Sequence, residues 1–325
     1  MNRHRHAGQK SLRHKKPFTV HAVQTGAALL VFFVLLFSAA AAVALSALNN
    51  RVAVRTSNQT VFSELAQAKE ALLSFALLYP DYYSGGPGRL PCPDTNNDGL
   101  TDFGCTSATI DQLPSYILPP LSPPPPDNDP PIMVLSNRIT GERFWYAITG
   151  LYLQNPVISL LNTDTSGTFS IDGQNGVVAV IIDAGPPVGT QTRSGGIPNP
   201  INYLEGGNQT PPDFVTSSAT PASFNDRVAF ITVAEIRTQM TVRVAQEIKR
   251  VLEMSGPNYP SDLDALNIEM NSAAAVWYND GDWESALENY MLVPPNSATL
   301  KFNNCTTTFT ITFGQPGLQR STGSC

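Results

Sequence analysis

The stretch that decides the fold begins at residues 27–48, which read AALLVFFVLLFSAAAAVALSAL. This segment carries no charge, and its only polar side chains are Ser38 and Ser46. About 20 apolar residues, at a helical rise of about 1.5 Å each, cross the hydrocarbon core of a bilayer. The sequence therefore predicts a transmembrane helix over residues 27–48.

The segment that follows changes from uniformly apolar to amphipathic. Apolar residues recur there at steps of three and four, at Val61, Leu65, Ala68, Leu72, Phe75 and Tyr79. This spacing places them on one face of an α-helix. No proline lies between Ala27 and Pro80. We therefore expect one long N-terminal helix, membrane-spanning and then amphipathic, that ends near Pro80 and the glycines of 85–88.

Charge is distributed unevenly on the two sides of the apolar segment. The first acidic residue is Glu64, and six basic residues precede the segment: Arg3, Arg5, Lys10, Arg13, Lys15 and Lys16. Removing these six from the 20 basic residues leaves 14 against 26 acidic residues. The positive-inside rule then places residues 1–26 in the cytoplasm and the rest, after Leu48, outside the inner membrane. The acidic body would repel phosphate, so no nucleic-acid partner is expected.

The apolar segment has one competing interpretation, an ordinary secretory signal that is cleaved. The apolar core of such a signal is usually about 7–15 residues long, which is shorter than this segment. The alanine-rich stretch at 39–47 nevertheless offers small residues of the kind that signal peptidase cuts.

Histidine is absent from the exported part, because all four histidines, His4, His6, His14 and His21, precede the apolar segment. This excludes Ser-His-Asp and Cys-His catalysis and histidine-ligated zinc there. A hydrolase that uses paired carboxylates remains an alternative, although no spaced pair stands out. We therefore expect a protein that is not an enzyme and has no catalytic residues or organic cofactor.

The four cysteines all lie in the exported part, where an oxidising periplasm favours disulfides. Four cysteines allow three pairings. The sequence favours Cys92 with Cys105 and Cys305 with Cys325, because the members of each pair are close along the chain.

A candidate calcium loop lies between the first two cysteines, in CPDTNNDGLTDFGC. Its oxygen donors alternate along the chain, as a calcium loop requires, at Asp94, Asn96, Asp98, Leu100 (through its carbonyl) and Asp102. The twelfth position, where a bidentate Glu is expected, holds Cys105. The alternative is a turn in which Asp and Asn side chains bind the local backbone and the disulfide closes the loop, without an ion.

The remaining chain alternates loops with short elements. Residues 114–131 are rich in proline and favour an extended segment. Strands are predicted at Arg143–Thr149, Thr168–Asp172, Val177–Asp183, Thr299–Phe302 and Thr307–Phe313. A second helix is predicted from Val233 to Ser255, with Thr232 and Glu235 as its capping box.

The predicted fold class is α+β, with each amphipathic helix packed on an antiparallel sheet. Four parts are expected: a basic leader (1–26), the transmembrane helix (27–48), a first module (49–228) and a second helix-plus-strand module (229–325). The landmarks of the second module repeat those of the first in the same order, which indicates an internal duplication. Chance similarity of two α+β segments is the alternative.

The sequence resembles type IV pilin-like proteins and type II secretion pseudopilins, in particular large prepilin-like membrane proteins of Gram-negative bacteria. The resemblance rests on the N-terminal order of elements and on GRLPCPDTNNDG, FWYAI, VVAVIIDAGPP, NYLEGGN and FNDRVAFIT. It implies cleavage by prepilin peptidase between Gly26 and Ala27. Family members usually carry Phe or Met after that bond and Glu at the fifth mature position, where this chain has Ala27 and Val31.

The resemblance implies a minor pilin or pseudopilin subunit, anchored in the inner membrane by one span, with its head in the periplasm. Its partners would be other subunits of a type IV pilus or type II secretion filament, at low copy number. The alternative is an anchored periplasmic module that binds a glycan or protein ligand outside any filament.

Overall fold

The computed structural model describes residues 36, 43, 46, 58–83, 85–102, 104–105, 109–117, 133–135, 142–154, 160–193, 197–217, 223–256, 258–272, 276–293 and 295–325. The predicted leader, the peptidase site at Gly26 and Ala27, and most of the predicted span at 27–48 lie outside these residues. Among the described residues, no helix combines the length and the apolar character needed to cross a membrane. The chain divides into two compact units, Met1–Asn58 and Gln59–Cys325, and the three sheets described below belong to the second.

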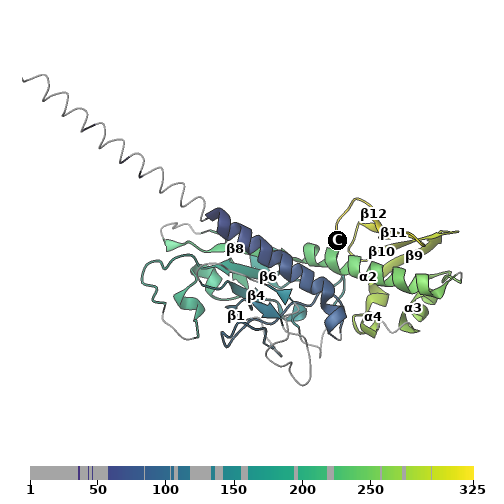
Figure 1. The fold of residues 1–325 in the computed structure, drawn as a ribbon, viewed down its shortest axis with the longest axis horizontal. Coiled ribbons are helices and arrows are strands. Elements are labelled where there is room, and N and C mark those ends of the chain that lie inside the picture. Colours follow the sequence, from purple (N-terminus) through teal and green to yellow (C-terminus); the bar gives the residue numbers. More distant parts are fainter. Residues whose placement is uncertain are drawn as a thin grey trace, which may run out of the picture. The chain divides into compact units, whose positions relative to one another are not determined.

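A helix over residues 58–82 lies along the larger sheet of this second unit (Figure 1). Its apolar stripe is buried, with Leu65, Leu72 and Ala76 at most 1% exposed. These side chains belong to the same hydrophobic cluster as Tyr146 and Val178 of the sheet. Apolar residues spaced three and four apart thus form one face of the helix, and burial of that face against the sheet holds the helix in place.

The larger sheet has six strands: β1 (Ile110–Gln112), β4 (Trp145–Ile148), β5 (Phe169–Ile171), β6 (Gln174–Asp183), β7 (Asp213–Phe214) and β8 (Arg227–Thr232). Its order is β1-β4-β6-β5-β7, and β8 also pairs with β6. Most pairs are antiparallel, but β5 and β7 are parallel. Strand β6 is central because both of its faces are buried, with Ile181 in one hydrophobic cluster and Val180 and Ile182 in the other.

A two-stranded hairpin, β2 (Tyr116–Ile117) and β3 (Met133–Val134), lies outside this sheet. Short 3₁₀ helices lie in the connections, among them η1 (Gly150–Tyr152), η2 (Pro200–Asn202) and η3 (Gly206–Gln209). The last two belong to the long connection between β6 and β8, which also contains β7.

The C-terminal part contains four helices and a four-stranded sheet. The helices are α2 (Val233–Ser255), α3 (Leu263–Ser272), α4 (Val276–Asp280) and α5 (Trp283–Ala286). The strands are β9 (Leu287–Val293), β10 (Ser297–Phe302), β11 (Thr308–Thr312) and β12 (Gln319–Arg320), each paired with the next along the chain. In β10, Ala298, Leu300 and Phe302 are buried while the alternate residues are partly exposed, as a sheet with one covered face requires.

Helix α2 begins as the sequence predicts, which confirms the capping box. The Thr232 hydroxyl accepts a hydrogen bond from the backbone N–H of Glu235, and the Glu235 carboxylate accepts from the backbone N–H of Thr232. The Lys69 ammonium also pairs with Glu235 over 2.5 Å. This pair connects the helix at 58–82 to the start of α2.

The predicted fold class is wrong. The described residues form a mixed α/β fold without the long apolar N-terminal helix, and the larger sheet is not antiparallel throughout. The two sheets also have different strand orders, so they do not repeat one module as the predicted duplication requires. The physical reason lies in β6: a strand buried on both faces takes partners from distant parts of the chain, and local spacing does not encode that choice.

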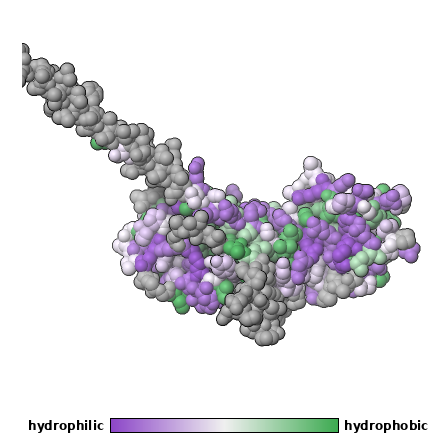
Figure 2. Space-filling view, viewed as in Figure 1, coloured by the Kyte–Doolittle hydropathy of each residue, from purple (hydrophilic) through white to green (hydrophobic). Residues whose placement is uncertain are grey.

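Among the coloured residues in Figure 2, hydrophilic ones predominate on the face shown. The exposed large apolar residues come from several different elements, among them Phe62, Ile197, Met254 and Ile268. Single exposed apolar side chains are normal on a soluble surface.

Candidate functional site

The loop between Cys92 and Cys105 is closed by a disulfide, and a second disulfide joins Cys305 to Cys325. These are the two pairings that the sequence favours. Inside the first loop, Asp94 is fully buried. Its two carboxylate oxygens accept hydrogen bonds from the backbone N–H groups of Gly99, over 2.7 Å, and Asp98, over 3.2 Å.

The other predicted calcium ligands also face local backbone groups. The Asn96 carbonyl oxygen accepts from the N–H of Asp98 over 2.9 Å, and an Asp98 oxygen accepts from the N–H of Leu100 over 2.8 Å. An Asp102 oxygen accepts from the N–H of Thr95 over 2.8 Å. The first two bonds are those of Asx-type turns, which the alternative interpretation of this loop requires.

The cation next to this loop is Arg143, which forms an ion pair with Asp94. Within the described residues, no group of three or more His, Cys, Asp or Glu side chains is arranged to hold a metal. The five predicted ligands therefore lie in one loop, but the most buried carboxylate, Asp94, is paired with the Arg143 guanidinium. Calcium binding at Asp94, Asn96, Asp98, Leu100 and Asp102 stays a prediction.

A further carboxyl group, that of Asp111, lies near this loop. Burial raises the pKa of Asp111 above its ordinary value, and the nearby carboxylates of Asp94 and Asp102 raise it as well. The backbone N–H of Gln112 and the Arg143 guanidinium act in the opposite direction. Sequence reasoning missed Arg143 as a partner, because 49 positions separate it from Asp94 and no local pattern links the two.

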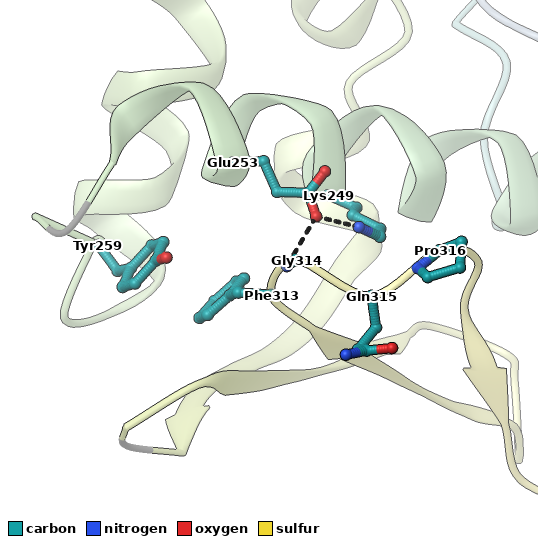
Figure 3. Close-up of a pocket in the computed structure, with 7 residues that line it drawn as sticks. All are labelled: Lys249, Glu253, Tyr259, Phe313, Gly314, Gln315 and Pro316. Atoms are coloured by element: carbon teal, nitrogen blue, oxygen red, sulfur yellow. Dashed lines mark hydrogen bonds and ion pairs between the residues drawn. The ribbon is translucent and has the colours of Figure 1, made fainter.

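A groove of about 550 Å³ lies between α2 and the turn after β11, and Figure 3 shows its lining. The lining residues are Lys249, Glu253, Tyr259, Phe313, Gly314, Gln315 and Pro316. The rings of Tyr259 and Phe313 are stacked, with centroids 3.9 Å apart and planes 11° apart.

The two charged side chains of the groove pair with each other. The Glu253 carboxylate pairs with the Lys249 ammonium and accepts a hydrogen bond from the N–H of Gly314 over 3.2 Å. Its only carboxylate is thus ion-paired, and the lining contains no Ser, Cys or His nucleophile or base. Sequence reasoning missed this groove, because Tyr259 and Phe313 come from separate segments.

Buried charges also occur on the larger sheet. Asp183 of β6, which is 2% exposed, pairs with Arg227 of β8 over 2.8 Å. The two residues are directly opposite each other in the register of these strands. A buried carboxylate of this kind needs such a partner, so the pair fixes the end of the β6–β8 ladder.

Comparisons with known proteins add no relative to this description. No protein-family model, no curated protein and no solved structure matches the chain.

Proposed function

We propose that the chain is a structural, pilin-like subunit, anchored in the inner membrane by its apolar segment at 27–48 and carrying its folded head in the periplasm. The observation that carries this proposal is the order of two neighbouring segments. An uncharged apolar stretch long enough to span a bilayer is followed by a helix at 58–82 whose apolar face belongs to the core of the head. Such an arrangement couples an anchor to a folded domain with little intervening chain.

The chemistry of the head supports a structural role. Residues 27–325 contain no histidine. The buried carboxylates of Asp94 and Asp183 are held by Arg143 and Arg227. Charges that are paired in this way stabilise loops and strands.

The sequence at position 31 supports a low copy number. In the proteins that this chain resembles, Glu at the fifth mature position neutralises the amino terminus of a neighbouring subunit, and this chain has Val31 there. An unpaired charge inside an apolar filament core is costly. A subunit without that Glu fits best at a tip or as an initiator, where fewer neighbours need it.

Processing of the N-terminus tests this proposal. The chain is produced in Gram-negative cells with and without prepilin peptidase, and the terminal peptide is identified by mass spectrometry. We expect a membrane-bound product that begins at Ala27 only when the peptidase is present. Gly26→Val should block the cut, while the control Gly8→Val, inside the leader, should leave it intact. A chain recovered in the soluble fraction would refute the anchor.

A second candidate is an anchored binding module, which the groove of Figure 3 favours. Aromatic rings next to polar side chains are common in sites that take sugars or short peptides. The test compares glycan binding by the full chain with binding by Tyr259→Ala and Phe313→Ala. Tyr116→Ala, which removes an aromatic ring that is 42% exposed elsewhere, is the control. Binding that is lost only in the two groove variants would support this candidate.

A further inference from the structure

Two buried carboxyl side chains meet beside the larger sheet. Glu205 directly precedes η3, Asp226 directly precedes β8, and they are 7% and 5% exposed. The backbone N–H of Glu205 donates to Asp226 Oδ2 over 3.0 Å, and the backbone N–H of Asp226 donates to Glu205 Oε2 over 3.1 Å. Each side chain therefore holds the main chain of the other. We call these two residues the carboxyl clasp.

The clasp joins three stretches of chain. The Gln191 side-chain amide donates to Glu205 Oε1 over 2.8 Å, and the Asn208 side-chain amide donates to Asp226 Oδ2 over 3.0 Å. The backbone N–H of Asn225 adds a bond to Glu205 Oε2 over 3.1 Å. Through these bonds, residues 184–193 and 203–217 are connected to the start of β8.

One oxygen of the clasp has no donor. Asp226 Oδ1 is buried and accepts no hydrogen bond in the described structure. A buried carboxylate oxygen without a donor is costly, whereas a protonated carboxyl group can donate its own hydrogen to a neighbouring carboxylate. Two adjacent buried carboxyl groups cannot both be ionised without strong repulsion.

The cations near the clasp are engaged elsewhere. The Arg193 guanidinium pairs with Glu142 over 2.7 Å and donates to the carbonyl oxygen of Tyr203, and Arg227 pairs with Asp183. Among the described ion pairs, neither guanidinium joins Glu205 or Asp226. None of the described ion pairs therefore neutralises the charge of the clasp.

We propose that one proton on the Asp226 carboxyl group keeps the clasp closed, and that its loss loosens residues 184–193 and 203–217 from the larger sheet. In the closed state, the proton on Asp226 is donated to the Glu205 carboxylate, so the pair carries a single negative charge. When the proton leaves to water, two negative charges face each other in a buried site. Opening of the two loops then lets water solvate both.

The direction of the pH dependence follows from the protonation of Asp226. Burial raises its pKa to about 8, and the Glu205 carboxyl raises it as well, while the Glu205 backbone N–H and the Asn208 amide lower it. In a solvated chain the pKa of Asp is about 4. The closed state thus binds more protons between these values. Its added stability is fully present below about pH 4, declines as the pH rises, and is lost once the pH has passed about 8.

This device gives the head a group that titrates near neutrality, although residues 27–325 contain no histidine. The loops that it controls include Tyr203 and Leu204, which belong to the smaller of the two hydrophobic clusters. Opening would expose part of that cluster. The clasp operates whether or not the chain belongs to a filament.

Hydrogen exchange of the full chain in detergent tests the clasp. Exchange in peptides from 184–193 and 203–217 is measured by mass spectrometry at several pH values and corrected for the intrinsic pH dependence of exchange. For the native chain, we expect protection to fall by up to about tenfold per pH unit between pH 5 and pH 7 and to level off above about pH 8. Asp226→Asn, whose amide imitates the protonated acid, should remove this dependence.

The matched control is Asp264→Asn, which neutralises an exposed carboxylate on α3 and should behave as the native chain does. Protection that falls equally in Asp226→Asn and the native chain would overturn the proposal. A measurement without variants covers the case in which Asp226→Asn does not fold. Carbon-13 NMR of labelled Asp carboxyl groups should show one group titrating above pH 7, and titration of every Asp below pH 6 would also overturn the proposal.

Discussion

The two sheets of the head are assembled in different ways. In the four-stranded sheet, each strand pairs with its neighbour along the chain. In the six-stranded sheet, β6 pairs with β4, β5 and β8, and long connections lead back to it. Buried acidic side chains accompany this sheet: Asp94, which pairs with Arg143, Asp183, which pairs with Arg227, and Glu205 and Asp226, which bond to each other's main chain.

The difference has a physical cause. Long connections bring irregular backbone into the interior, where each N–H group needs an acceptor. Carboxylates such as Asp94 supply acceptors for more than one N–H group at once. The short turns of the four-stranded sheet create fewer such needs, so that sheet relies on alternating apolar side chains. We therefore expect substitutions that remove a charged side chain to destabilise the larger sheet. Substitutions that shorten a buried apolar side chain should destabilise the smaller one.

The largest effect is expected for Asp94→Ala. This change removes the acceptor of the Gly99 N–H and the ion-pair partner of Arg143, while the side chains of Asn96 and Asn97 still accept from the Asp98 N–H and from Arg143. Breaking one partner of a buried ion pair costs about 3–5 kcal/mol. Urea unfolding of the chain, followed by tryptophan fluorescence, measures the free energy of unfolding. A loss below about 1 kcal/mol, similar to that of the exposed control Asp264→Ala, would contradict the role of Asp94.

Leu300→Ala tests the smaller sheet. Leu300 is fully buried in β10, and truncation of such a leucine costs about 2–5 kcal/mol through lost apolar contacts and the cavity that remains. The loss should be the same at pH 5 and pH 8, because no ionisable group is removed. The same unfolding experiment at both pH values measures it. A loss that changes strongly with pH would break the distinction between the two sheets.

Thr232→Ala tests the boundary between the two sheets, where β8 passes into α2. Loss of the hydroxyl that accepts from the N–H of Glu235 should cost about 1 kcal/mol. Glu235→Gln keeps the reciprocal bond to the backbone and is the matched variant. Thermal unfolding of both variants decides whether the hydroxyl matters: equal melting temperatures for Thr232→Ala and the native chain would show that it does not.

Glu235→Gln also tests a pH effect. Burial raises the pKa of Glu235, but bonds from Lys69 and Thr232 outweigh burial and hold it below the ordinary value. The ionised carboxylate thus adds stability above the pKa of an unfolded Glu, and this contribution disappears as the pH falls through the lower folded pKa. The native chain should lose this part of its stability on acidification, and Glu235→Gln should not.

The smallest effect is expected for Lys301→Ala. Lys301 pairs with Glu288 over 2.6 Å on the exposed face of the smaller sheet, and both side chains are more than a third exposed. Surface pairs of this kind contribute about 0–1 kcal/mol, reduced further by salt. A loss well above 1 kcal/mol that persists in high salt would show that charges support this sheet too.

Local patterns in the sequence predict some elements and not others. The capping box at Thr232 and Glu235 predicts the start of α2, because the signal is contained within four consecutive residues. The predicted strand at 177–183 lies within β6, and its unbroken apolar run is what a strand buried on both faces needs. The partners of β6, the Arg143 ion pair and the clasp of Glu205 with Asp226 depend on contacts between distant segments. No spacing rule specifies those contacts.

The candidate sites show the same limit. The alternation of Asp94, Asn96 and Asp98 identifies a loop rich in side-chain oxygens. It does not specify whether those oxygens bind a metal ion or accept hydrogen bonds from backbone N–H groups. Hydrogen-bond directions favour the backbone in this structure. The groove was missed because Tyr259 and Phe313 are brought together only when α2 and the smaller sheet pack.

The abundance of the chain in purified filaments tests the central proposal most directly. Filaments are sheared from cells that produce the native chain, and its copy number is measured by quantitative mass spectrometry against the major subunit. The account predicts that the chain is present at a small fraction of the major subunit, and that Val31→Glu raises its incorporation. Stoichiometric abundance would contradict the low-copy role, and complete absence together with an uncut leader would contradict the filament subunit and favour the anchored binding module.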